Sequence, residues 1–254
     1  MTSISALLGP VLLGTVLLGP APGRQRGTVP TVETLVERVA NTWDPLRATL
    51  RARMTVIRAG RPPSAFELLI RRGGRGRTRI DFLSPANDEG KVVLSIGKQA
   101  WLYLPRADRV VELPARRNPL AGGVLFEDLS LGAAETTGAF VEQTDDAFVL
   151  AASGSKGAKK ASNRVYFDKS TLLPVRREVY APSGRLLKTV YIDETRAWHA
   201  VEIPWKVRFV DHLEHGTETH IDILKAEELG DDVEALFSRD RLKQVPGAGA
   251  SNGR

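Results

Sequence analysis

The sequence predicts a mainly β protein (α+β) built around a single antiparallel sheet that curls on itself. Three observations support this fold class. After one helical stretch, apolar and polar residues alternate along most of the chain, which is the period of a strand. Turn signals separate roughly ten to twelve such stretches at regular spacing. The stretches are not interleaved with helices, which argues against a βαβ fold.

Residues 1–23 stand apart from the rest of the chain. An apolar run extends from Ala6 to Leu18, and the first charged side chain is Arg24. A run of this length followed by small residues is typical of a secretory signal peptide and is short for a membrane span. No lysine or arginine precedes the run, so an uncleaved N-terminal anchor is the alternative. We expect the chain to be exported.

The first element after this segment is an amphipathic helix that begins near Pro30. Apolar residues recur at the spacing of one helix face: Val32, Leu35, Val36, Val39, Ala40 and Trp43. Thr31 is suited to cap the helix, Glu33 lies in its first turn, and Pro45 ends it.

From residue 46 onward the apolar residues occupy every second position. Residues 46–56 form a long strand with one face toward solvent, and the segment 60–63, "GRPP", makes a turn. Further strands are expected at 65–72, 78–83, 91–96, 100–105, 109–113, 147–153, 163–168, 173–181, 186–193, 203–212 and 217–229. We see no internal repeat and no linker, so residues 24–242 form one domain, and the small and polar residues 243–254 form a disordered tail.

One segment breaks this meander. Residues 118–135, "NPLAGGVLFEDLSLGAAE", resemble a loop with a short helical centre around residues 126–131. A long excursion in a compact domain is usually functional or disordered. This one contains too many apolar residues to be disordered, so we expect it to be functional.

Composition and motifs exclude several classes of protein. The net charge is +6, but the 36 lysines and arginines are spread along the chain, which indicates a solvated basic surface and no nucleic-acid partner. The absence of cysteine excludes disulfides, a thiol nucleophile and a lipid-modified N-terminal cysteine. There is no GxSxG, P-loop or strand-following GxGxxG motif, and the glycines of "GGRGR" (73–77) suit a turn. We expect neither an enzyme nor a cofactor.

One histidine cluster allows an alternative. In "DHLEHGTETH" (211–220), a hairpin turn could bring His212, Glu214 and His220 together as three metal ligands. Polar residues across a hairpin are more often a solvated edge, and no HExxH motif is present. We therefore expect no metal site.

Residues 77–114 contain the segment Ser84-Pro85, a Gly turn at Gly97 and the pattern W-x-Y-x-P from Trp101 to Pro105. In this order the features resemble the core of the periplasmic lipoprotein carrier LolA and its relatives. Later segments resemble the LolA-like branch described as outer-membrane lipoprotein-sorting proteins: 126–130, 173–193, 203–211 and 216–223. The resemblance extends from about residue 32 to residue 240.

This resemblance implies an incomplete antiparallel β-barrel whose open, apolar inner face is covered by a few helices. It implies a periplasmic, non-catalytic and monomeric carrier that sorts lipoproteins or lipids toward the outer membrane. Its ligands would be lipoprotein acyl chains or phospholipid, received from an inner-membrane export complex and passed to an outer-membrane acceptor. Burial of a 16-carbon chain would contribute on the order of 10 kcal/mol, at about 0.8 kcal/mol per CH₂.

The resemblance also suggests site residues. The expected lining of the lipid cavity is Phe66, Leu68, Ile70, Phe82, Leu94, Trp101 and Tyr103, with Leu125 and Phe126 as contacts of a lid. Arg72 occupies the position of an arginine that latches the lid in LolA, although Gly73 replaces the proline that follows it there. The alternative for the apolar residues is an ordinary filled core, and for Arg72 a solvated arginine beside a hairpin.

Two other functions stay open at this point. The protein could be a non-catalytic accessory protein of a membrane export or efflux complex that uses its sheet as an interaction surface. It could also be a metal-dependent enzyme at His212, Glu214 and His220.

Overall fold

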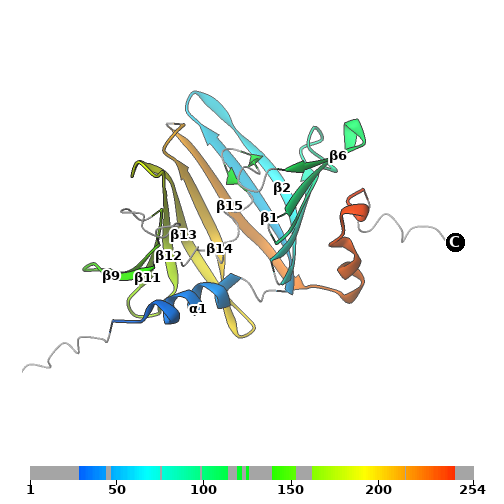
Figure 1. Ribbon diagram of the computed structural model, residues 1–254. Helices are drawn as coiled ribbons and strands as arrows, with labels where there is room; N and C mark the ends of the chain where they lie inside the picture. The colour runs from blue at the N-terminus through cyan, green and yellow to red at the C-terminus, as the bar shows by residue number, and fades with distance from the viewer. Residues whose placement is uncertain are drawn as a thin grey trace, which may run out of the picture.

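The structure is a computed structural model that describes residues 29–43, 47–74, 76–97, 99–113, 119–121, 124–125, 139–152, 162–214 and 216–243. The predicted signal peptide or anchor and almost all of the predicted tail lie outside these residues, so the expected domain bounds stay predictions. Within them, a 13-stranded antiparallel sheet dominates the chain. It curves into two wings (Figure 1) and its end strands do not pair with each other. The prediction of a mainly β, incompletely closed sheet is confirmed.

The order of strands across the sheet is β6-β5-β4-β3-β2-β1-β15-β14-β13-β12-β11-β10-β9. Their bounds are β1 Arg47–Arg58, β2 Arg61–Gly74, β3 Arg77–Ser84, β4 Val92–Ile96, β5 Gln99–Leu104, β6 Arg109–Leu113, β9 Phe140–Gln143, β10 Ala147–Ala152, β11 Asn163–Asp168, β12 Pro174–Tyr180, β13 Leu186–Trp198, β14 Val201–Asp211 and β15 Thr217–Glu228. Each wing is a meander of neighbouring strands, β1 to β6 in the first wing and β9 to β15 in the second. Only the pairing of β1 with β15, in which Met54 lies opposite Ile221, joins distant parts of the sequence.

The sequence-based elements differ from the structure in several places. Pro62 and Pro63, expected in a turn, lie in the exposed first residues of β2, where proline is tolerated because few ladder bonds are needed. Strand β9 was not expected. The excursion contains a separate two-stranded ladder of β7 (Pro119–Ala121) and β8 (Val124–Leu125), and its expected helical centre lies outside the described residues.

Helix α1 (Val32–Trp43) begins where the sequence predicted. The Thr34 backbone N–H donates to Thr31 Oγ1 at 3.2 Å, which is the expected N-cap. Leu35 and Val39 are buried against β10 and β11 in one cluster with Phe148, Leu150, Val165 and Phe167. Val165 of β11 lies opposite Arg177 of β12, which in turn lies opposite Val190 of β13. Directly opposite residues point to the same side of a sheet, so these three residues share the face on which α1 packs. We call it the inner face.

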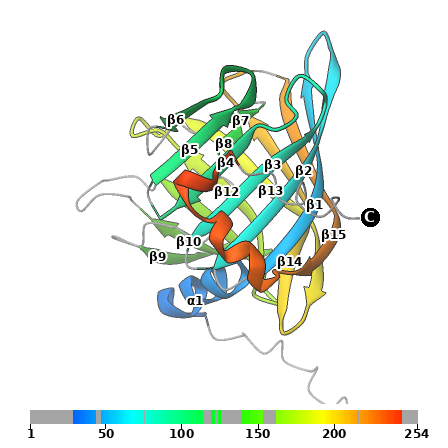
Figure 2. The same ribbon diagram turned by 90° about the vertical axis from the view of Figure 1, so that its right-hand side faces the viewer.

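The opposite, outer face of the first wing is covered by the C-terminal segment 229–243, which we call the strap. It contains two short 3₁₀ helices, η3 (Asp231–Leu236) and η4 (Arg239–Arg241). Figure 2 shows the strap, in orange to red, lying across strands of that wing. Its residues Leu229, Phe237 and Leu242 are buried together with Val92, Leu94 and Trp101.

The strap explains two features of the sequence. Strand β5 is apolar on both sides because Leu102 lies opposite the buried Val93 on the inner face while Trp101 packs under the strap. Gly73 lies under the ring of Phe237, and a Cβ at this position would be 2.9 Å from that ring. A residue with a side chain, such as the proline of the related pattern, would displace the ring.

A charged group is also buried under the strap. Arg79 is fully buried, and Asp81 accepts hydrogen bonds from both Arg71 and Arg79. Arg79 Nη1 in turn donates to the backbone carbonyl of Arg241 at 3.0 Å. Polar as well as apolar contacts therefore hold the strap against the sheet.

The turn after β11 gives a prediction about acid stability. The Asp168 carboxylate accepts hydrogen bonds from the backbone N–H groups of Ser170 and Thr171 and from their hydroxyls, which lowers the pKa of Asp168 from 3.8 to about 2. A carboxyl whose pKa is lower in the folded state adds stability above its unfolded pKa, and this stability is lost as the pH falls toward the folded pKa. We expect Asp168→Asn to reduce the loss of unfolding free energy between about pH 5 and pH 2 in urea titrations. An unchanged acid dependence would contradict this role.

Candidate functional site

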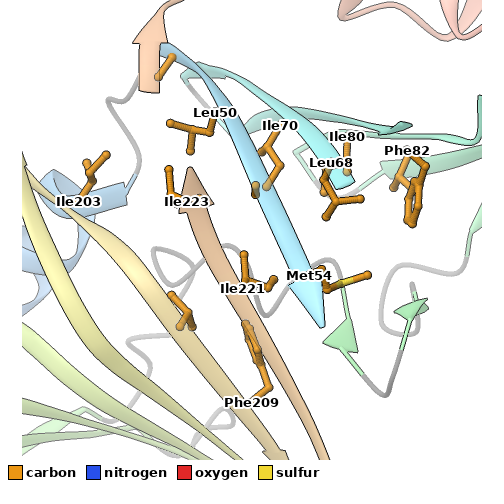
Figure 3. Close-up of a cluster of buried hydrophobic side chains, with 14 of the residues drawn as sticks. Leu50, Met54, Leu68, Ile70, Ile80, Phe82, Ile203, Phe209, Ile221 and Ile223 are labelled. Carbon is orange, nitrogen blue, oxygen red and sulfur yellow. The ribbon is translucent and has the colours of Figure 1, made fainter. Parts of the chain in front are cut away.

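The candidate site is the inner face of the sheet, where both wings contribute apolar side chains to one cluster. Its buried members are Ala48, Leu50, Ala52, Met54, Leu68, Ile70, Ile80, Phe82, Val93, Val190, Ile203, Val207, Phe209, Ile221 and Ile223. Figure 3 shows side chains of β1, β2, β3, β14 and β15 gathered on this face. We call this set the inner cluster.

Four of the predicted lining residues belong to the inner cluster or pack against it. Leu68, Ile70 and Phe82 are buried members, and Phe66 is partly buried beside them. The rings of Phe66 and Phe82 meet edge to face with their centroids 6.1 Å apart, a favourable geometry for aromatic pairs. The structure therefore brings these four residues together.

The structure corrects the placement expected for Leu94, Trp101 and Tyr103. All three belong to the cluster under the strap, on the outer face of the sheet. Leu94 pairs with Trp101, whereas their neighbours Val93 and Leu102 pair with each other and pack on the inner side. Successive side chains of a strand point to opposite faces of the sheet. A strand that is rich in aromatic residues therefore does not by itself show which of its faces is the inner one. Leu102 takes the place that we expected for Trp101.

The predicted lid contacts and latch stay predictions. Leu125 lies in β8, whose side chains are not among the described features, and Phe126 lies outside the described residues. Arg72 is buried and pairs across the sheet with Ala48, a member of the inner cluster. It therefore lies on the inner face, which does not fit the alternative of a solvated arginine beside a hairpin.

Sequence reasoning missed the contribution of the central and later strands to the site. Met54 of β1, Phe209 of β14 and Ile221 of β15 are buried in the inner cluster. Each lies in an alternating apolar stretch, so the signal was present. Their assignment to the same surface depended on the pairing of β1 with β15, which no local pattern reveals.

Aromatic and charged side chains gather where β13 and β14 meet in a tight turn. Trp198, Val201 and Trp205 are partly buried and pack against the inner cluster. The Arg196 guanidinium lies 4.4 Å from the centre of the Trp205 ring, in a cation–π contact. This end of the inner face therefore changes from apolar to amphipathic.

The alternative of a metal site is not supported by the geometry. His212 Nε2 lies 2.9 Å from Thr189 Oγ1, and His220 Nε2 lies 3.1 Å from Glu218 Oε2. The two imidazoles thus face different partners. Among the described residues, which do not include His215, no group of three histidine or acidic side chains is arranged to hold a metal ion.

The comparisons with known proteins agree with this architecture. A family model described as "-like: Uncharacterized protein" matches residues 74–244, well over half of the chain. A LolA superfamily protein from Nitrosomonas europaea is similar over 83% of this chain and 99% of its own, at 19% identity and a TM-score of 0.64. The chain belongs to the matched family, and its fold is LolA-like.

Two further solved structures share the LolA-like fold. An outer membrane lipoprotein-sorting protein domain from Vibrio parahaemolyticus is 21% identical, with a TM-score of 0.65 and coverage of 84% of this chain and 98% of its own. A DUF1329 family protein from Desulfovibrio piger is 18% identical, with a TM-score of 0.65 and coverage of 83% and 97%. No curated protein matches the sequence. In the part of the LolA-like chain that the structure describes, no helix has the length and apolar character needed to cross a membrane.

Proposed function

We propose that this LolA-like protein is a non-catalytic carrier that binds acyl chains of lipoproteins or lipids on its inner face. The observation that carries the proposal is the inner cluster, in which strands from both wings contribute apolar side chains to one continuous cluster on the inner face. The fold shared with an outer membrane lipoprotein-sorting domain agrees with it. No cofactor or metal is needed for such binding.

The two faces of the sheet differ in a way that suits this role. On the outer face of the second wing, strands present charged and aromatic pairs, such as Arg208 with Asp193 and Arg208 stacked on Tyr191. On the outer face of the first wing, the strap covers the apolar residues. The inner face is therefore the surface on which an acyl chain would gain most, about 0.8 kcal/mol for each CH₂ that it buries.

The proposal includes a cellular setting. The carrier would act as a monomer in the periplasm, after export through the apolar N-terminal residues. It would receive its lipid or lipoprotein from an inner-membrane complex and release it to an outer-membrane acceptor. Nucleic acid is not a partner in this scheme.

Native mass spectrometry of protein exported in a Gram-negative host, with lipid extraction of the same sample, tests the proposal. We expect phospholipid or lipoprotein to co-purify at close to one molecule per chain. An apo mass, with no uptake when lipid is offered, would reject the carrier function. That outcome would favour an accessory protein of an export complex, for which the sheet is an interaction surface.

Two leucine substitutions test whether lipid binds to the inner or the outer face of the sheet. Leu102 is partly buried and packs against the inner cluster, whereas Leu69 is similarly buried, pairs with Asp81 and so lies on the outer face. A carboxylate at position 102 would have to be desolvated by a bound acyl chain, which is costly. We expect Leu102→Glu to reduce binding of a fluorescent fatty acid at least tenfold, about 1.4 kcal/mol, and Leu69→Glu to leave it unchanged. Circular dichroism checks that both variants fold, and Leu102→Ala provides a milder version. Equal binding by all three variants and the wild type would contradict the proposal.

A further inference from the structure

A hollow of about 370 Å³ lies between helix α1 and the turn that joins β13 to β14. Its lining comes from Arg38, Thr42, Leu173, Ala197, His199, Ala200, Val201 and Glu202. Figure 1 shows α1 and the β13–β14 turn at the same end of the molecule. The volume is within the range of sites that bind small molecules, about 300–1,000 Å³.

Two oppositely charged side chains line this hollow without a side-chain partner among the described residues. Among the described residues, neither the Arg38 guanidinium nor the Glu202 carboxylate has an ion pair or a side-chain hydrogen bond. Other acidic side chains at this end already have partners, since Glu228 Oε1 lies 3.4 Å from His199 Nε2 and Glu194 pairs with Arg196. The hollow thus offers one cation and one anion to a ligand.

The hollow adjoins the face proposed to hold acyl chains. Val201 lines the hollow and also packs against the inner cluster. Its strand partner Trp198 packs there too. An acyl chain that lies along the inner face and reaches this end would place its headgroup beside Arg38 and Glu202.

We propose that this hollow is a headgroup site for a zwitterionic phospholipid of the phosphoethanolamine type. The Arg38 guanidinium would bind the phosphate, since guanidinium and phosphate form strong charge-assisted hydrogen bonds. The Glu202 carboxylate would accept hydrogen bonds from the ammonium group. This inference rests on the proposed carrier function and adds the class of lipid that the carrier selects.

The test compares three ligands that share one palmitoyl chain: lysophosphatidylethanolamine, lysophosphatidylglycerol and monopalmitoylglycerol. They carry a zwitterionic, an anionic and an uncharged headgroup. Binding to the full chain is measured by competition with a fluorescent fatty acid. We expect the wild type to bind lysophosphatidylethanolamine about tenfold more tightly than lysophosphatidylglycerol, the effect of one charge-assisted hydrogen bond.

Three variants test which side chain causes the headgroup preference. Glu202→Gln should bring the ratio of the two phospholipid affinities close to one. Arg38→Gln should weaken both phospholipids about tenfold and leave monopalmitoylglycerol unchanged. Arg53 is exposed on β1 and does not line the hollow, so Arg53→Gln is the matched control and should behave as the wild type.

The outcomes separate this inference from the function on which it rests. Binding of all three ligands without preference, or preferences that survive Glu202→Gln and Arg38→Gln, would overturn the headgroup site and leave the carrier function intact. Failure of the wild type to bind any ligand, monopalmitoylglycerol included, would overturn both.

Discussion

Replacement of Asp81 by alanine is expected to lower the free energy of unfolding by about 3–5 kcal/mol, the cost of breaking a buried ion pair from one side. Asp81 lies between two arginines that are themselves buried: the side chain of Arg71 is 6% exposed and that of Arg79 is 0% exposed. Without the carboxylate, two guanidinium groups would remain under the strap with their principal counter-charge removed.

Urea-induced unfolding, followed by circular dichroism, measures this loss. The matched control is Asp193→Ala, which removes a carboxylate from the pair with Arg208, where the two side chains are 30% and 43% exposed. An exposed pair contributes about 0–1 kcal/mol, so the control should stay close to the wild type. Similar losses for the two variants would show that the buried group has no special role.

Phe237→Ala is expected to cost a comparable amount, about 3–5 kcal/mol for a buried phenylalanine. The ring of Phe237 is buried among Leu94, Trp101 and Leu242 and lies directly over Gly73. Removing it would leave a cavity between the strap and the sheet. Because Trp101 packs in the same cluster, we also expect its fluorescence to shift to longer wavelength as water gains access.

The control for this substitution is Leu213→Ala, since Leu213 is 52% exposed in the turn after β14. Its stability should differ from that of the wild type by less than about 0.5 kcal/mol. A Phe237→Ala protein with wild-type stability and unchanged Trp101 emission would contradict a packed strap. Gly73→Ala offers an independent check, because its Cβ would press on an intact Phe237 ring.

These two substitutions concern the outer face, but they bear on the proposed function. A carrier that presents an apolar surface on both sides of a sheet would be prone to associate through the wrong side. The strap covers the apolar residues around Trp101 on the outer face, so in the proposed carrier the inner face is the side that binds lipid. Loss of the strap should therefore promote self-association, which light scattering of the Phe237→Ala protein would detect.

Local features were predictable because local physics determines them. The Thr31 cap of α1, the alternation along β1 and the turn after β11 all depend on residues within a few positions of one another. The resemblance carried by the segment from Ser84 to Pro105 led to the incomplete barrel, and the observed sheet agrees with it. Phe66, Leu68, Ile70 and Phe82 lie together because β2 and β3 form a hairpin, while their role in lining a lipid cavity stays a prediction.

By itself, the sequence determined the fold class, the positions of most strands and the division of each strand into two faces. Only the tertiary structure decided which face of β4 and β5 is inner, because the cover of the outer face comes from the strap at the far end of the chain. It likewise decided that β1 and β15 join the two wings and that Arg38 and Glu202 share one hollow. The alternation of apolar and polar residues specifies that successive side chains point in opposite directions. Which segment covers each face of the sheet depends on contacts between parts of the chain that are far apart in the sequence.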